Sequence, residues 1–208
     1  MAETSRIFLW DPIVSASVEA LLWDEITTSH LAQWEKTWVP ERAAIRKRLE
    51  DAKISKDQWP QSIHWEWPIK IADVSGLLAY AGFAVTCGNA LEGLMRVALH
   101  RSARLPSEVG KPLVYIDYVE VAPWNWPAMG KPLRYKGIGT ALLTAAVILS
   151  RKEGFYGRVG LHSLPQAAAF YVKAGMATLG EDPDVEGLDY FELSPAAASA
   201  FLGKEADL

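Results

Sequence analysis

The sequence contains a single cysteine, Cys87, among its 208 residues. One thiol cannot form an internal disulfide, and it cannot supply the several sulfur ligands of a cysteine-based metal cluster. Long apolar runs are missing too: no window approaches the roughly 18 uninterrupted apolar residues of a membrane-spanning helix, and the N-terminus has no basic segment followed by a long apolar stretch. We therefore expect a soluble, cytoplasmic protein with no membrane partner.

A surplus of positive charge is also missing. The chain has 21 lysines and arginines against 25 aspartates and glutamates, for a net charge of -4 at pH 7. Because nucleic-acid-binding surfaces usually cluster Lys and Arg, we expect no nucleic-acid partner, whereas an amine substrate would not be repelled. Hydrophobic residues make up 50% of the sequence, which at this length is enough for one sizeable core. We therefore predict one domain over residues 1–208.

Hydrophobic patterning divides this predicted domain into four parts. Residues 6–10 are a short strand candidate, and the spacing of apolar residues predicts helices over 15–38 and 41–53, with a break at Pro40. The four parts are a helical N-terminal part (1–76), a hairpin turning at Gly88-Asn89 (77–112), a core of strand, loop and helix (113–180) and a C-terminal strand and helix (181–208).

Aromatic residues are concentrated near the end of the first part. Residues 59–68 contain three tryptophans together with His64 and Glu66. Indole faces attract cations and apolar groups, and His and Glu exchange protons, so the segment could line a pocket. The alternative is a proline-bounded loop whose tryptophans cap the core, because large aromatic side chains are mostly buried for packing.

A strand that is apolar on both faces is predicted over 113–122. This pattern is typical of an interior strand covered on two sides, yet the strand contains Asp117 and Glu120. Desolvation would raise the pKa of either carboxylate, which is what a general base working near neutral pH requires. The alternative is that these carboxylates form structural hydrogen bonds or emerge at the strand's edge.

A glycine-bearing loop precedes the next helical pattern, which covers 141–153. Closely spaced glycines let backbone N–H groups turn toward one point, with the positive end of the helix dipole behind them. A phosphate or pyrophosphate would suit that point. The loop comprises Arg134, Tyr135, Lys136, Gly137, Ile138, Gly139 and Thr140.

The following strand, 158–164, is predicted to lead into a second helix, where Ser163 and Gln166 have the spacing of a capping box. Tyr171 lies one position round from the packing face of this helix, so its hydroxyl can leave the apolar face and reach a cleft. The alternative is an ordinary packing residue of an amphipathic helix. His162 has two open orientations, into the site or across the sheet.

Residues 113–180 resemble the cofactor-binding half of the GNAT superfamily of N-acetyltransferases. The match comprises the strand end Val119-Glu120-Val121-Ala122-Pro123, the pattern Arg134-x-x-Gly137-x-Gly139, and the late helix Ala167-x-x-Phe170-Tyr171-x-Lys173-x-Gly175-Met176. The resemblance implies an α/β fold with a mixed, mostly antiparallel sheet that is splayed between two strands and has helices on both faces. It also implies acetyl-CoA as co-substrate, wedged into the opening, and no metal.

The resemblance implies roles for individual residues. The pantetheine arm would pair with the backbone at Val119 and Val121, and the pyrophosphate would lie on the amides of 134–140. Tyr171 matches the tyrosine that protonates the departing thiolate in many relatives. Glu120 is the first candidate for the general base, with Asp117 and His162 behind it. The implied activity is acetyl transfer to a primary amine of a small molecule or peptide, by direct attack on the thioester.

One departure from the family pattern is a Trp- and Pro-rich insertion, 124–133, between Pro123 and Arg134. We predict that it contributes to the acceptor site together with the earlier tryptophans; the alternative is a rigid loop covering the sheet edge. The predicted substrate-binding residues are Trp65, Trp67, Trp124 and Trp126.

Two other functions stay open. One is a non-catalytic acyl-CoA-binding regulatory module, and the other is a toxin-type acetyltransferase acting on aminoacyl-tRNA, which the acidic balance disfavours. At the C-terminus, residues 189–193 are a predicted strand, followed by a short helix capped by Ser194 that either packs on the sheet or forms a homodimer contact. The acceptor amine, and the choice between acetyl and a larger acyl group, are not specified by the sequence.

Overall fold

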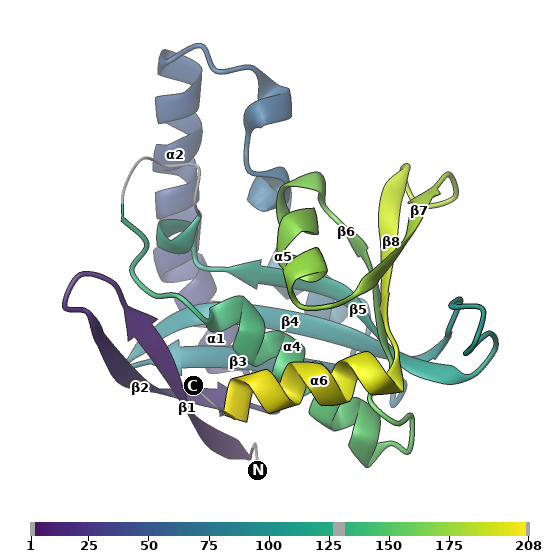
Figure 1. Ribbon diagram of the computed structural model, residues 1–208. Coiled ribbons are helices and arrows are strands. Elements are labelled where there is room, and N and C mark those ends of the chain that lie inside the picture. The colour runs from purple at the N-terminus through teal and green to yellow at the C-terminus, as the bar shows by residue number, and fades with distance from the viewer. Residues whose placement is uncertain (1–2, 127–131, 207–208) are drawn as a thin grey trace. The chain divides into compact units, whose positions relative to one another are not determined.

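The computed structural model describes residues 3–126 and 132–206, which contain an eight-stranded sheet and helices (Figure 1). The strands are β1 (Thr4–Asp11), β2 (Ala16–Trp23), β3 (Tyr80–Cys87), β4 (Ala90–Ser102), β5 (Pro112–Val121), β6 (Val159–Ser163), β7 (Ala177–Asp182) and β8 (Leu188–Leu193). The α-helices are α1 (Thr28–Gln33), α2 (Val39–Asp51), α3 (Trp67–Ala72), α4 (Ile138–Lys152), α5 (Ala168–Lys173) and α6 (Pro195–Ala206).

The strand order in the sheet is β1-β2-β3-β4-β5-β6-β8-β7. β5 and β6 run parallel, whereas β1–β2, β2–β3, β6–β8 and β7–β8 run antiparallel. The parallel ladder ends at the pair Ile116–Leu161, although β5 continues to Val121. β5 therefore extends beyond its ladder with β6, in agreement with the predicted splaying. The predicted fold class, a mixed and mostly antiparallel sheet with helices, is confirmed.

The chain divides into two compact units, each built from separate stretches of sequence. The first unit comprises Met1–Leu78, Gly82–Met95 and Val119–Leu142, and the second comprises Ala79–Ala81, Arg96–Tyr118 and Leu143–Leu208. The division falls inside β3, β4, β5 and α4, so the units do not coincide with the four parts predicted from patterning. A single domain over residues 1–208 stays a prediction.

In the first unit, the predicted helix over 15–38 is wrong for its first half, because residues 16–23 form β2. Val18, Leu21 and Leu22 fit helical spacing, but a short apolar segment does not distinguish a helix from a strand. The neighbouring strands determine that the segment is a strand. β2 pairs with β1 on one side and β3 on the other, and these ladders satisfy its backbone hydrogen-bonding groups. The N-terminal part is thus a β-hairpin followed by helices.

The predicted break at Pro40 is also wrong. A π-helical turn, Trp34–Trp38, connects α1 to α2, and Pro40 is the second residue of α2. Trp34 and Trp38 are both buried, and the Trp38 indole donates to the carbonyl of Leu91 at 3.0 Å. The helical segment is therefore continuous and is anchored by its tryptophans.

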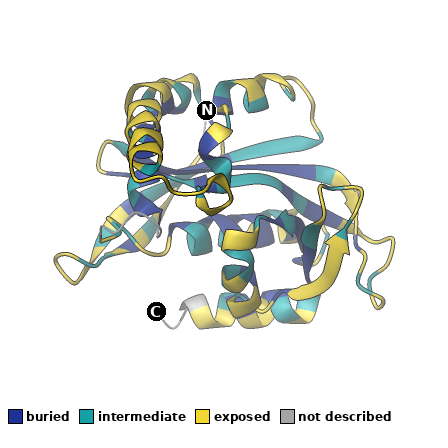
Figure 2. Ribbon diagram, turned by 90° about the horizontal axis from the view of Figure 1, so that it is seen from above, coloured by how far each residue is buried: buried dark blue, intermediate teal, exposed yellow. Residues whose placement is uncertain are grey.

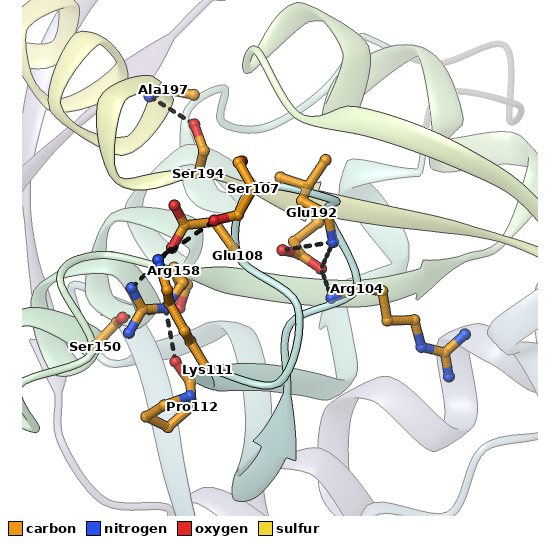
Figure 3. A network of polar contacts seen from close by, with 11 residues as sticks. Arg104, Ser107, Glu108, Lys111, Pro112, Ser150, Arg158, Glu192, Ser194 and Ala197 are labelled. Carbon is orange, nitrogen blue, oxygen red and sulfur yellow. Dashed lines mark hydrogen bonds and ion pairs between the residues drawn. The ribbon is translucent and has the colours of Figure 1, made fainter.

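In the second unit, β7 has no counterpart among the predicted strands. It is exposed along almost its whole length (Figure 2), so it has no hydrophobic alternation to reveal it. Its ladder with β8 holds it in place. By contrast, the predicted cap of α6 is confirmed, because the amide of Ala197 donates to the hydroxyl oxygen of Ser194 at 3.2 Å (Figure 3).

The predicted capping box at Ser163 is wrong. A 3-10 turn, Pro165–Ala167, precedes α5, and the hydroxyl of Ser163 donates to the carbonyl of Leu164 at 2.8 Å instead. In the described parts of the chain, no helix combines the length and apolar character needed to cross a membrane.

Candidate functional site

The glycine-bearing loop belongs to the first unit and leads straight into α4. Gly137 has a φ of 97°, a left-handed conformation that favours glycine, and α4 begins at the next residue, Ile138. The first-turn amides of a helix have no partners within it, and the helix dipole places partial positive charge beside them. The 15-residue helix α4 thus has an N-terminus suited to an anion where the sequence predicts one.

Two amides of this loop already have partners in the protein. The amide of Lys136 donates to the carbonyl of Trp10 at 2.8 Å, and the amide of Trp10 donates to the carbonyl of Lys136 at 3.1 Å. The amide of Tyr135 donates to the side-chain oxygen of Asn125 at 2.9 Å. The predicted phosphate cradle therefore narrows to the other amides, those of Arg134, Gly137, Ile138, Gly139 and Thr140.

A fully buried carboxylate on β4, Glu92, lies against the start of this loop. Its Oε2 accepts hydrogen bonds from the Trp124 indole at 2.7 Å and from the side-chain Nδ2 of Asn125 at 2.8 Å. Its Oε1 is 3.2 Å from Nη1 of Arg134. Burial raises the pKa of Glu92, while these donors and the Arg134 charge act in the opposite direction. Sequence reasoning missed Glu92, because it lies just after the predicted turn at Gly88-Asn89, where a charged residue is expected to be exposed.

Glu120, also in the first unit, is the second buried carboxylate. Glu120 is 4% exposed, and its Oε2 accepts a hydrogen bond from the Trp67 indole at 2.6 Å. Its Oε1 is fully buried, and no hydrogen bond of normal geometry reaches that atom from the described residues. Burial raises the pKa of Glu120 to about 7, against the nearby positive charge of Arg42. The carboxylate can therefore change protonation state near neutral pH.

Arg42 holds the Trp-rich segment beside Glu120. This buried side chain donates to the carbonyls of Trp65 and Ser62, both at 2.7 Å, and its guanidinium carbon lies 5.3 Å from the ring centre of Trp34. The Trp65 ring is partly exposed and has the ammonium of Lys70 at 4.9 Å from its centre. The contacts of Arg42 therefore link α2 to the segment that precedes α3.

The other predicted substrate-binding tryptophans differ in exposure. Trp67 is completely buried at Glu120, and Trp126 is buried in a cluster with Ile45 and Ile63. The burial of Trp67 agrees with the alternative interpretation for its segment, tryptophans that cap the core. Substrate binding by Trp67 and Trp126 stays a prediction. Trp124 is partly exposed, and its indole N–H donates a hydrogen bond to the buried carboxylate of Glu92 on β4. Residues 127–131 of the insertion lie outside the described residues.

Asp117 belongs to the second unit and is held in an ion pair. Its Oδ2 lies 3.0 Å from Nη2 and 3.2 Å from Nε of Arg96, and both side chains are largely buried. Arg96 in turn lies against the rings of Tyr80 and Tyr118. Burial raises the pKa of Asp117, and the Arg96 charge opposes that shift. Asp117 thus has a structural partner of opposite charge.

His162, in the second unit, uses both ring nitrogens in hydrogen bonds across the sheet. Nδ1 is 2.5 Å from the hydroxyl of Tyr115 on β5, and Nε2 is 2.9 Å from Oδ2 of Asp182 on β7. Burial raises the pKa of Tyr115 to about 12, so this hydroxyl is the donor to Nδ1. Arg104 and His162 hold the pKa of Asp182 at about 2. Sequence reasoning missed these partners, because separate strands bring them together.

Tyr171, on α5 in the second unit, is buried rather than turned away from the apolar face. Its ring lies 5.1 Å from that of Phe170 and 5.8 Å from that of Phe191, measured between centres. Burial raises the pKa of Tyr171, so the hydroxyl keeps its proton at neutral pH. Such a phenol can donate a proton but is a poor base.

Within residues 3–126 and 132–206, no group of three or more His, Cys, Asp or Glu side chains is placed to hold a metal ion.

No protein-family model matches the sequence, and no curated protein matches it. Solved structures do. The PaiA N-acetyltransferase from Thermoplasma acidophilum, in complex with coenzyme A, is 14% identical with a TM-score of 0.51, over 83% of this chain and 97% of that one. Mycobacterium smegmatis RimJ, in complex with CoA-disulfide, is 13% identical with a TM-score of 0.52, over 98% and 95%.

The GNAT domain of S. lividans PAT is similar as well. It is 14% identical with a TM-score of 0.51, and the match covers 91% of this chain and 96% of that domain. Identities this low concern the fold alone. The chain therefore has the fold of GNAT acetyltransferases.

Proposed function

We propose that this chain, which has the GNAT fold, is an acetyl-CoA-dependent N-acetyltransferase acting on a primary amine of a small molecule or peptide. The observation that carries the proposal is the composition of the first unit: it combines a glycine-bearing loop at the N-terminus of α4 with Glu120, whose pKa burial raises to about 7. The similar structures that hold coenzyme A or CoA-disulfide support an acyl-CoA as donor.

In the proposed donor site, the backbone at Val119 and Val121 pairs with the pantetheine arm. The carbonyl of Val121 already accepts the Trp126 indole at 3.0 Å, and its second lone pair leaves room for a further donor. The pyrophosphate rests on the first-turn amides of α4, beginning at Gly137 and Ile138, where the helix dipole favours negative charge.

In the proposed reaction, Glu120 is the general base. One N–H bond of the substrate ammonium breaks as the carboxylate gains the proton, directly or through a water. The free amine attacks the thioester carbonyl and the new C–N bond forms. The C–S bond breaks as Tyr171 gives its proton to the leaving thiolate, and the second proton of the attacking nitrogen passes through water to the Tyr171 phenolate, which leaves a neutral amide and a free thiol. Asp117 is neutralised by Arg96, and His162 has both nitrogens bonded, so Glu120 is the carboxylate best prepared to accept a proton.

The direct test measures acetyl-CoA binding by calorimetry and thiol release with a broad panel of amines, using the full chain. We expect saturable binding and thiol release with at least one amine. A parallel series of longer acyl-CoA donors defines the preferred acyl group. Binding without thiol release across the panel would contradict the enzyme and favour a non-catalytic acyl-CoA-binding module, and no binding would contradict both.

Tyr171→Phe tests the proposed acid. We expect turnover to fall by about tenfold to a hundredfold, because general acid catalysis is lost, while the Kd for acetyl-CoA changes by less than about twofold. The control is Tyr156→Phe, which removes a hydroxyl from an exposed tyrosine of the same unit. Unchanged turnover in the Tyr171 variant would remove this residue from the proposed role.

A further inference from the structure

Ten residues, 124–133, separate Pro123 from Arg134, where the candidate donor loop starts. A connection of this length does not by itself fix the position of the loop, because the entropy lost on joining two ends rises with the number of residues between them. A donor site whose phosphate ligands are backbone amides needs those amides held in place before the donor arrives. Some contact must therefore fix the loop relative to the strand end.

The contact that joins the two ends of the insertion is centred on Glu92. On the strand side, this carboxylate binds the side chains of Trp124 and Asn125, and on the loop side it pairs with Arg134. Asn125 also accepts the amide of Tyr135, so it contacts both the carboxylate and the loop. We call these five residues the Glu92 clamp.

The Glu92 clamp is tied to the sheet as well. The amide of Ala122, at the end of β5, donates to the carbonyl of Glu92 at 2.9 Å. The carboxylate is completely buried, and a buried charge is tolerated only where its partners are well placed. The carboxylate of Glu92 is therefore fixed by the sheet on one side and contacts the candidate donor loop on the other.

The clamp also orients the guanidinium of Arg134. One terminal nitrogen is paired with Glu92, and the guanidinium carbon lies 5.2 Å from the ring centre of Tyr135 and 5.9 Å from that of Trp124. The side chain is 45% exposed, and a guanidinium carries five N–H donors in a rigid plane. Its orientation is therefore set from the buried side, and the exposed part of the side chain is available to a phosphate.

We propose that Glu92 is the positioning residue of the donor site, and that its carboxylate fixes Arg134 and the loop amides for a diphosphate ester. The inference rests on the proposed function in one respect, that the loop receives the pyrophosphate of an acyl-CoA. Glu92 acts through other residues and does not touch the donor. Its loss should therefore affect ligands that contain the diphosphate and spare those that lack it.

The test compares coenzyme A with pantetheine, which lacks the diphosphate and the nucleotide, by calorimetry on wild type and Glu92→Gln. We expect the Kd for coenzyme A to rise by about tenfold, because one charge-assisted contact is lost, and the Kd for pantetheine to change by less than about twofold. With acetyl-CoA, the KM should rise while kcat at saturation stays within about twofold. Equal weakening of both ligands would indicate a merely structural role and would overturn the inference.

Glu192→Gln is the matched control. Glu192 is also a completely buried glutamate in a strand. Its carboxylate accepts hydrogen bonds from the backbone amides of Arg104 at 2.6 Å (Figure 3) and Leu105 at 3.3 Å. This variant should lower the melting temperature without changing the ratio of the coenzyme A and pantetheine affinities. A change in that ratio equal to that of Glu92→Gln would overturn the inference.

A second variant keeps the inference testable if Glu92→Gln does not fold. Trp124→Phe keeps an aromatic ring beside Arg134 but removes the indole donor to Glu92. It should raise the Kd for coenzyme A by a smaller factor than Glu92→Gln does, and it should leave the Kd for pantetheine unchanged. An unchanged Kd for coenzyme A in a folded Trp124→Phe protein counts against the clamp. Wild-type binding of coenzyme A and acetyl-CoA, with no thiol released from acetyl-CoA across the amine panel, would instead contradict the proposed enzyme and leave this inference standing.

Discussion

β5 contains two carboxylates, one in each unit. They differ in the charge of the group that contacts them most directly. Asp117 faces the guanidinium of Arg96 at 3.0 Å, whereas Glu120 receives one neutral indole N–H, from Trp67, and its other oxygen has no normal hydrogen bond. Burial raises the pKa of both. The difference shows that burial prepares a carboxylate to exchange protons only where no cation is paired with it directly.

The largest expected effect is that of Glu120→Gln. Because a general base contributes about a hundredfold or more, kcat should fall by at least that factor while the Kd for acetyl-CoA stays within about twofold. The folded state binds the Glu120 proton up to pH about 7, whereas the unfolded chain releases it at lower pH, so wild-type stability falls as pH rises through this interval. The variant should therefore gain stability relative to wild type at pH 8. Unchanged kcat in this folded variant would remove Glu120 from the mechanism.

Asp117→Asn should act on stability. The substitution leaves the largely buried Arg96 without its counter-charge, which typically costs about 3 kcal/mol, measured by denaturant unfolding. Replacing both partners, with Asp117→Leu and Arg96→Met, should cost less than Asp117→Asn alone. If Asp117→Asn keeps its stability and loses turnover as completely as Glu120→Gln, the roles of the two carboxylates are reversed.

The smallest expected effect is a shift in the pH profile of kcat. Glu120 must be ionised to accept a proton, so kcat should rise with pH below about 7 and level off above it. Trp67→Phe removes a hydrogen bond that favours the ionised form, and the midpoint should move to higher pH. Trp38→Phe also loses a buried indole donor, but one bonded to Leu91, so its midpoint should not move. A shift to lower pH in Trp67→Phe would contradict the assignment.

The fold of the central region was predictable because its signals are local. An apolar strand, glycines at close spacing and a long helical pattern occur in sequence order, and β5, Gly137 and α4 follow them. The two strands that sequence analysis missed, β2 and β7, lack such signals. β2 has apolar spacing that fits both a helix and a strand, and β7 is exposed, so in each case the neighbouring strand decides the structure.

For the candidate site, the sequence indicated the reactive groups but not their partners. Glu120 is recognisable as a carboxylate on an apolar strand, but its partner Trp67 is 53 positions away in the sequence, where the pattern of tryptophans predicts a substrate contact instead. Glu92 and Arg134 likewise come from distant segments. Partners of this kind are set by strand pairing and helix packing, which a single sequence does not encode in any local pattern.

The backbone bridge between Trp10 and Lys136 ties the N-terminal hairpin to the candidate donor loop through main-chain atoms alone. Any residue with an amide hydrogen can make this bridge, so the chemical identity of position 10 is almost free, and only proline, which lacks that hydrogen, breaks it. What matters is alignment: one residue added or removed between the hairpin turn and position 10 would present a different amide to the loop. A comparison of related sequences should therefore show a constant number of residues between the hairpin turn and position 10, with variable residue types at position 10.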